Sequence, residues 1–236
     1  MEISTAFPFI KETGHIVCLV GGGGKTSLMF ALAHAAADHG MRILVTTTTH
    51  IGIPKDHPVV SSSEEAKAAF LETSIVVAGF AENNRKLSQP QDFDPVLCRQ
   101  AADLILIEAD GAKNLPCKVP AAHEPVIPEA ADIVIGVIGM DTPGKRLGEI
   151  CFRKAETMAF LGTDENHIMT IDDMAAILTS PLGTMKGVGE KKYIIVLNKC
   201  DDIHRKNLAA DLRKVLVQKG FADVFCMSVK QTSAVW

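Results

Sequence analysis

A run of glycines followed by a lysine and two hydroxyl residues is the strongest chemical signal in the sequence. It consists of Gly21, Gly22, Gly23, Gly24, Lys25, Thr26 and Ser27. Glycines let successive backbone N–H groups converge on phosphate oxygens without a Cβ clash, and a helix starting here adds the positive end of its dipole. We expect Lys25 to act catalytically on the β- and γ-phosphates of a nucleotide, and Thr26 to ligate Mg²⁺, with Ser27 as a spare hydroxyl.

This segment is shorter than the usual G-x-x-x-x-G-K-[ST] pattern, because Leu19 stands where the first glycine would be. The remaining G-x-x-G-K-T resembles the short loops of the Mur ligases, which use ATP. A dinucleotide-binding turn is an alternative interpretation, but it has no use for Lys25. It would also require an acidic residue after the second strand, where residues 46–49 are all threonine.

A second signal, N-K-C-D, follows an apolar run near the C-terminus. It resembles the guanine-reading N-K-x-D motif of GTPases, in which the carboxylate, here Asp201, accepts both the ring N–H and the exocyclic amine of guanine. The resemblance implies that Lys199 lies against the base and that Asn198 ties neighbouring loops together. Ser228 and Lys230 resemble the S-A-K turn behind the base. This motif favours GTP, although a polar turn capping the next helix is the alternative.

Two acidic residues end an apolar run, in the sequence L-I-L-I-E-A-D-G. A carboxylate at the end of a phosphate-side strand can hold magnesium directly or through water. We assign the metal to Asp110 and the orientation of a catalytic water to Glu108, although the reverse order also fits. A charge-stabilising arginine could be any of Arg85, Arg99, Arg146 and Arg153.

These residues need a scaffold, and the sequence predicts an α/β fold. Short apolar runs without strict alternation are typical of buried parallel strands, and we expect strands at 15–20, 42–47, 75–79, 104–109, 133–138, 193–197 and 224–227. Helices are expected at 26–39, 63–72 and 204–219. The pattern predicts one three-layer, P-loop NTPase-like domain over residues 1–236, with a mostly parallel central sheet and a small insertion around 140–165.

Composition excludes several other classes of protein. Lys plus Arg total 24 against 28 Asp plus Glu, so the net charge of -4 gives no basic field for nucleic acid. No apolar run approaches the roughly 20 residues that a membrane span needs. The N-terminus lacks the features of a secretory signal, and the six cysteines include no C-x-x-C pair, so we expect free thiols in a reducing, cytoplasmic setting.

Taken together, the sequence is similar to the YqeC family, accessory proteins linked to selenium-dependent molybdenum hydroxylases. The similarity covers residues 19–26 and 44–50, and above all the block from 108–113 to 123–128. It implies that Lys118, His123 and Glu124 line the site and receive the substrate on which the nucleotide acts; composition alone predicts a proline-stiffened surface loop. It also implies a molybdopterin-type cofactor and an apo molybdenum hydroxylase as partners.

Three functions are compatible with these residues. The first is a Mg²⁺-dependent NTP hydrolase, in our interpretation a GTPase with ATP as the other nucleotide, which drives maturation of the hydroxylase. The second is a nucleotide-gated chaperone that hydrolyses slowly or not at all. The third is an ATP-dependent kinase or ligase that transfers a phosphoryl group to a small acceptor.

Overall fold

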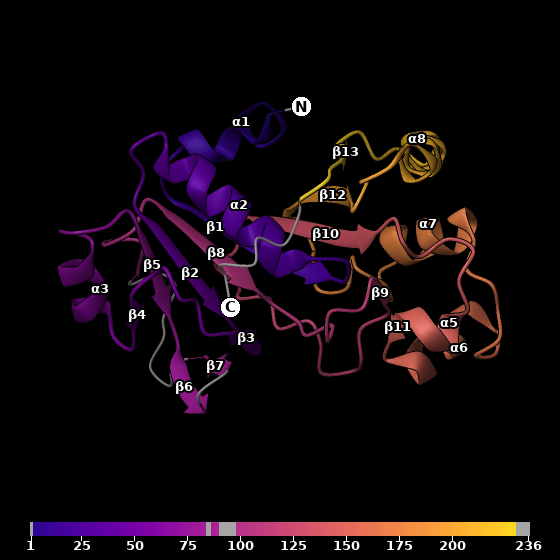
Figure 1. Cartoon of the computed structure of the whole chain (residues 1–236), viewed down its shortest axis with the longest axis horizontal. Coiled ribbons are helices and arrows are strands. Elements are labelled where there is room, and N and C mark those ends of the chain that lie inside the picture. The colour runs from indigo at the N-terminus through magenta and orange to yellow at the C-terminus, as the bar shows by residue number, and fades with distance from the viewer. Residues whose placement is uncertain (1, 84–85, 90–97, 230–236) are drawn as a thin grey trace.

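The computed structural model describes residues 2–83, 86–89 and 98–229, and its central feature is an eight-stranded sheet (Figure 1). Across the sheet the strands are β13 (Val224–Cys226), β12 (Lys192–Asn198), β10 (Ile133–Gly139), β1 (His15–Gly21), β8 (Leu104–Glu108), β2 (Ile43–Thr47), β5 (Ile75–Ala78) and β4 (Val59–Val60). All neighbouring strands are parallel. The predicted α/β class and its seven strands are confirmed, and the two-residue strand β4 is additional.

Alternate side chains of each central strand pack on opposite faces of the sheet, as a parallel sheet covered on both sides requires. In β1, Val17 and Leu19 contact one apolar cluster, whereas Ile16, Cys18 and Val20 contact another. Both faces are therefore covered, which explains why the strands read as continuous apolar runs.

Helices cover the two faces and form the outer layers. Their bounds are α1 (Ile3–Ala6), η1 (Pro8–Lys11), α2 (Lys25–Ala37), α3 (Ser63–Ala69), α5 (Leu147–Ile150), α6 (Lys154–Leu161), α7 (Ile171–Thr179) and α8 (Ile203–Gln218). Helices α1, η1 and α2 pack on one face, and α3, α7 and α8 pack on the other. The three expected helices are present as α2, α3 and α8, each with slightly shorter bounds at its C-terminal end.

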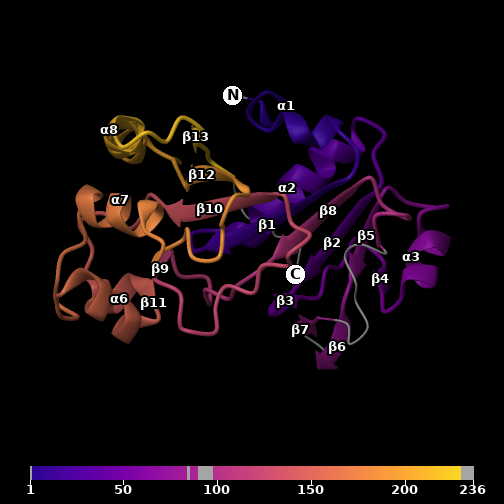
Figure 2. The ribbon, with the colours of Figure 1, turned by 180° about the vertical axis from the view of Figure 1, so that it is seen from behind.

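Two small sheets lie beside the main one and were not expected. Strands β3 (His50–Gly52), β7 (Lys86–Ser88) and β6 (Phe80–Asn83) form an antiparallel sheet, and β9 (Cys117–Lys118) pairs with β11 (Cys151–Phe152) (Figure 2). Helices α5 and α6 lie within the segment 140–165.

The expected free thiols are confirmed, since all six cysteines are unpaired by disulfides. None of the helices in the described ranges combines the length and the apolar character that crossing a lipid bilayer demands.

The parallel arrangement fixes where polar loops gather. Because β1, β8, β2, β10 and β12 run in the same direction, the segments that follow them emerge at one edge of the sheet. Ligands of open α/β sheets bind at this carboxyl edge. The glycine run after β1, the acidic residues after β8 and the N-K-C-D residues after β12 are therefore brought to the same place.

Candidate active site

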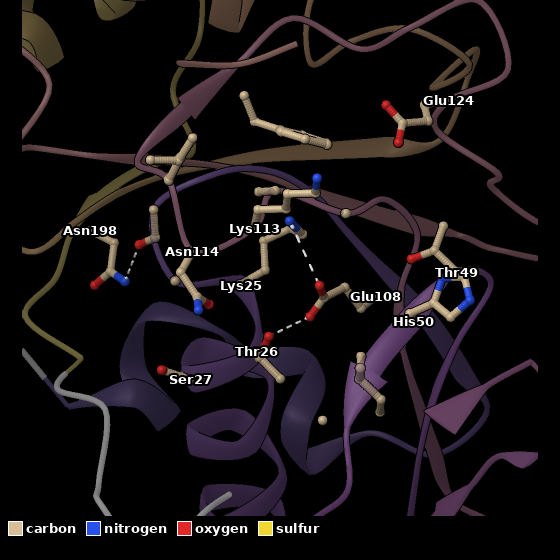
Figure 3. A pocket seen from close by; sticks show the side chains of 18 of the residues that line it. Lys25, Thr26, Ser27, Thr49, His50, Glu108, Lys113, Asn114, Glu124 and Asn198 are labelled. Atoms are coloured by element: carbon tan, nitrogen blue, oxygen red, sulfur yellow. Dashed lines mark hydrogen bonds and ion pairs between the residues drawn. The ribbon is translucent and has the colours of Figure 1, made fainter. Parts of the chain in front are cut away.

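A cavity of about 1480 Å³ runs along the carboxyl edge of the sheet. Predicted site residues that line it are Gly23, Gly24, Lys25, Thr26, Ser27, Glu108, His123, Glu124, Asn198, Lys199 and Asp201. Figure 3 shows Asn198 on one side of Lys25, Thr26 and Glu108, and Thr49, His50 and Glu124 on the other. Gly21, Gly22, Asp110, Lys118 and Ser228 are not among the lining residues, and Lys230 lies outside the described residues.

The glycine run packs so closely against neighbouring backbone that side chains do not fit. A Cβ on Gly23, which has a φ of +79°, would lie 2.2 Å from the backbone nitrogen of Gly139. A Cβ on Gly22 would lie 2.8 Å from the carbonyl oxygen of Leu115. The loop therefore needs glycine for close backbone approach as much as for conformational freedom.

The expectation that all the glycine N–H groups face phosphate needs correction. The N–H of Gly21 donates to both carboxylate oxygens of Asp110 at 3.1 Å. Those of Gly22 and Gly23 donate to the carbonyls of Val137 and Leu115, at 2.9 and 3.0 Å. Such close packing leaves these amides with internal acceptors.

N–H groups without an internal acceptor therefore lie one turn further along the chain. Helix α2 begins at Lys25 with Gly24 as its N-cap. The first N–H groups of a helix have no intrahelical acceptor, so those of Lys25, Thr26 and Ser27 are suited to an anion.

Lys25 lies in the centre of the site and is only 3% exposed. Its ammonium donates to the carbonyl of Gly21 at 2.7 Å and forms ion pairs with Asp110 at 3.2 Å and Glu108 at 3.8 Å. Burial alone would lower the pKa of Lys25, but the two adjacent carboxylates outweigh it and raise the pKa above its ordinary value. Lys25 is therefore a fixed positive charge beside the helix N-terminus.

Thr26 and Glu108 form the pair that best fits a magnesium ion. The hydroxyl of Thr26 donates to Oε2 of Glu108 at 2.6 Å, and both residues line the cavity. Burial raises the pKa of Glu108, and the Lys25 charge and the Thr26 hydrogen bond counteract this only in part. Within the described ranges, no three His, Cys, Asp or Glu side chains form a metal site. One carboxylate and one hydroxyl could hold a Mg²⁺ together with phosphate oxygens and water.

The geometry reverses the order that we favoured for the two acidic residues. Asp110 is 1% exposed and accepts the Gly21 N–H with both oxygens. Its carboxylate also pairs with Lys25 at 3.2 Å and with Lys118 at 3.1 Å. Because its oxygens already have these partners and Asp110 is not among the residues that line the cavity, Asp110 organises the loop, and Glu108 is the better metal ligand.

The expected substrate residues Lys118 and Glu124 also belong largely to this internal network. Lys118 is 1% exposed and donates to the carbonyl of Gly111 at 2.7 Å and to Glu124 at 2.8 Å. Arg153 contacts both oxygens of Glu124, at 3.0 and 3.2 Å. Although burial opposes it, hydrogen bonding to Arg153 and Lys118 lowers the pKa of Glu124 to about 2. Lys118 is therefore too enclosed to meet a substrate, whereas His123 lines the cavity.

The N-K-C-D residues define the other end of the cavity. The Asn198 amide donates to the carbonyl of Gly23 at 2.8 Å and accepts the N–H of Val229 at 3.1 Å, so it joins two loops. Lys199 donates to Asp141 at 2.8 Å. Asp201 accepts a short hydrogen bond from Ser228 and an ion pair from Arg205. Ser228 thus contacts the carboxylate assigned to base recognition rather than the cavity itself.

One of the four candidate arginines reaches the site. Arg153 lines the cavity, whereas Arg99 pairs with Asp132, Arg146 is exposed outside the lining, and Arg85 lies outside the described residues. Sequence reasoning gave no role to several other lining residues, among them Lys113, Asn114, Asp141 and Arg205. The only available signal for Lys113 was its place in the block 108–113.

Comparisons with known proteins confirm the family that the sequence resembles. The family model described as "YqeC protein" matches residues 17–155. The Escherichia coli (strain K12) protein called "Uncharacterized protein YqeC" is 29% identical over 230 residues, covering 93% of this chain and 90% of that protein.

A solved structure of Hydrogenase Maturation Factor HypB from Archaeoglobus fulgidus aligns with a TM-score of 0.38 and 13% identity. The alignment covers 95% of this chain and 85% of that chain. At this similarity it supports no inference about the site.

Proposed function

The chain belongs to the YqeC family, and from the geometry of its cavity we propose that it binds a nucleoside triphosphate with Mg²⁺ and hydrolyses the terminal phosphate. The observation that carries the proposal is the joint placement of three groups. The Lys25 ammonium, the Thr26 hydroxyl bonded to Glu108, and the N-terminus of α2 meet in a cavity large enough for a nucleotide.

Each of these groups has a distinct part in the proposed reaction. Lys25 would exchange its contact with the Gly21 carbonyl for β- and γ-phosphate oxygens, and the N–H groups of the first turn of α2 would donate to the same phosphates. Thr26 and Glu108 would hold the metal. Bound Mg²⁺ would neutralise charge that develops on the transferred phosphoryl group.

We propose GTP as the preferred nucleotide, with Asp201 as the residue that selects the base. Its carboxylate lines the cavity and can accept two guanine donors, while adenine presents the wrong pattern. Ser228 and Arg205 restrict its orientation. Asn198 links this end of the cavity to the glycine loop. The alternative outcome is that the site prefers ATP to GTP.

Family resemblance extends the proposal to a biological role. We propose that nucleotide binding serves the maturation of a selenium-dependent molybdenum hydroxylase, with a molybdopterin-type cofactor and the apo-enzyme as partners. This role rests on the resemblance alone, whereas nucleotide binding also rests on the geometry of the site.

A direct test is calorimetric titration with GTP and with ATP in the presence of Mg²⁺, followed by assays of phosphate release. We expect tighter binding of GTP and loss of both binding and turnover in Lys25→Ala. Lys67→Ala, on the exposed surface of α3, is the matched control and should behave as wild type. Nucleotide binding that is absent from the wild type, or unchanged in Lys25→Ala, would refute the proposal.

A second candidate function, phosphoryl transfer to a small acceptor, is favoured by the extent of the cavity. Its lining continues past Glu108 to Thr49, His50 and Lys86, beyond the residues expected to bind nucleotide. Release of phosphate that requires an added acceptor would favour transfer, whereas constant release without one would favour hydrolysis.

A further inference from the structure

The cavity is larger than one small ligand needs. Its volume of about 1480 Å³ exceeds the roughly 300–1,000 Å³ of typical ligand pockets. In Figure 3, Asn198 lies on one side of Lys25 and Glu108, while His50 and Glu124 lie on the opposite side. We call the latter part the distal half and assign to it the lining residues His50, Lys86, His123, Phe152 and Arg153. Lys113 lies beside Lys25 in the figure and reaches the distal half through its contact with the Phe152 ring. A nucleotide that spans from Asp201 to Lys25 would leave this half open.

Strained backbone is concentrated around this cavity. The non-glycine residues with positive φ in the described part of the chain are Lys113 (46°), Asn114 (62°), Arg153 (60°) and Lys199 (63°). All four line the cavity. A left-handed conformation is unfavourable for a residue with a Cβ, and such residues cluster at ligand sites. Lys113 and Arg153, which both contact the Phe152 ring, are therefore two cations of the cavity with left-handed backbone.

The cation Arg153 is positioned by a chain of buried ion pairs that starts at the glycine loop. Asp110 pairs with Lys118 at 3.1 Å, Lys118 with Glu124 at 2.8 Å, and Glu124 with Arg153 at 3.0 Å. The guanidinium lies 4.9 Å from the centre of the Phe152 ring. Its Nε and Nη2 contact Glu124, and among the described residues Nη1 has no hydrogen-bond partner. Arg153 is thus held in a fixed position, and its Nη1 N–H groups can still donate hydrogen bonds to a ligand.

Lys113 brings a second positive charge to the same ring. Its ammonium lies 5.4 Å from the centre of Phe152, and no carboxylate in the described ranges forms an ion pair with it. Next to it, Nη2 of Arg153 lies 3.2 Å from Nε2 of His123. Because a guanidinium can only donate, Nε2 accepts and the ring proton belongs on Nδ1. Three cations therefore lie over the Phe152 ring: Lys113, Arg153 and, at 5.5 Å, Lys118. Lys118 is buried and already paired with Asp110 and Glu124, so Lys113 and Arg153 are the two that line the cavity.

We propose that the distal half binds a second, phosphate-bearing small molecule, with Arg153 and Lys113 as its anion ligands and Phe152 as an apolar wall. This inference rests on the proposed function, because it takes the remaining half of the same cavity. An arginine with spare donors matches the fork geometry of phosphate oxygens, and two cations match the double charge of a phosphate monoester better than a single carboxylate.

The test is a titration of the protein with inorganic phosphate after saturation with Mg²⁺ and a non-hydrolysable GTP analogue. Because hydrogen bonds to a charged group are worth roughly 1.5–3 kcal/mol, we expect saturable binding that weakens about tenfold or more in Arg153→Gln. Lys113→Gln should weaken it less. Arg146→Gln, outside the cavity lining, is the control and should leave it unchanged. Succinate tests whether a carboxylate binds equally well.

Further measurements distinguish a failure of this inference from a failure of the proposed function and from misfolding of a variant. Affinity for the GTP analogue reports whether Arg153→Gln remains folded, and Arg153→Lys retains the charge without the fork. If the analogue does not bind, phosphate titration of the unloaded protein still tests Arg153. Loss of phosphate binding in Lys25→Ala but not in Arg153→Gln would place phosphate in the glycine loop and overturn the inference. Absence of saturable phosphate binding, or equal binding of succinate, would also overturn it.

Discussion

The base end and the phosphate end of the cavity are held together in different ways. At the base end, the Asp201 side chain is 36% exposed, and its partners Arg205 and Ser228 lie close to it at the surface. At the phosphate end, Lys25 and Asp110 are 3% and 1% exposed and are paired with each other. The first arrangement is a set of surface contacts, whereas the second is a buried ionic network.

This difference determines how much stability a substitution at each end of the cavity costs. An exposed ion pair contributes about 0–1 kcal/mol, since water screens it and the side chains lose entropy in forming it. Removing one member of a buried network leaves its partners charged and without compensation, which costs about 3–5 kcal/mol. We therefore expect the phosphate end to be rigid and necessary for folding, and the base end to be adjustable without loss of stability.

The largest effect is expected for Asp110→Asn. The substitution removes the charge that compensates both Lys25 and Lys118, so we expect a loss of about 3–5 kcal/mol in the free energy of unfolding. Urea denaturation measures it. Asp211→Asn is the matched control, because within the described ranges Asp211 pairs with the exposed Lys214 alone. A loss below 1 kcal/mol would contradict the idea of a buried network.

The second prediction concerns acid stability and Glu124. Its pKa lies at about 2, below the ordinary 4.5, so its contribution to stability is complete above pH 4.5 and is lost as the pH falls toward 2. Glu124→Gln should destabilise the protein by about 3 kcal/mol at pH 7. The difference from wild type should shrink as the pH falls through this range. Urea midpoints of both proteins between pH 7 and pH 3 measure it; a constant difference would contradict the assignment.

The same contrast explains which parts of the site could be predicted from the sequence. Lys25, Thr26 and Asp201 belong to contiguous motifs, whose spacing indicates their chemistry directly. The roles of Asp110 and Lys118 depend on which way a buried side chain points, and neighbouring residues in the sequence do not determine this. Glu108 and Asp110 both follow the same strand, but only the structure shows that Glu108 meets Thr26.

The fold was predictable where the pattern was strong and local. The seven buried strands are marked by apolar runs, and Gly40 and Gly220, both with positive φ, follow α2 and α8. Helix α7 was missed although its start carries a capping box between Thr170 and Asp173. The small sheets escaped prediction because strands of two to four residues have too little periodicity to be distinguished from loops.

A smaller effect, on metal rather than on stability, should distinguish the two acidic residues. If Glu108 holds Mg²⁺, Glu108→Gln should raise the Mg²⁺ concentration needed for half-maximal activity by about 10–100-fold. As the control, the wild type and Glu108→Gln are both titrated with nucleotide in the absence of metal, which shows whether nucleotide binding itself is intact in the variant. An unchanged Mg²⁺ requirement in Glu108→Gln would show that Glu108 is not the metal ligand and would favour the original assignment to Asp110.

The smallest effect on stability is expected for Asp201→Asn, which breaks only exposed contacts and should cost no more than about 1 kcal/mol. Its effect on base preference should be clear, because the amide replaces one acceptor with a donor and loses the charge that guanine recognition uses. We expect GTP affinity to fall about tenfold or more while ATP affinity stays the same. Calorimetry with both nucleotides, beside Lys67→Ala as control, measures the change. Equal weakening for GTP and ATP would show that Asp201 supports the loop without reading the base, and the base end would then resemble the phosphate end more closely than its exposure suggests.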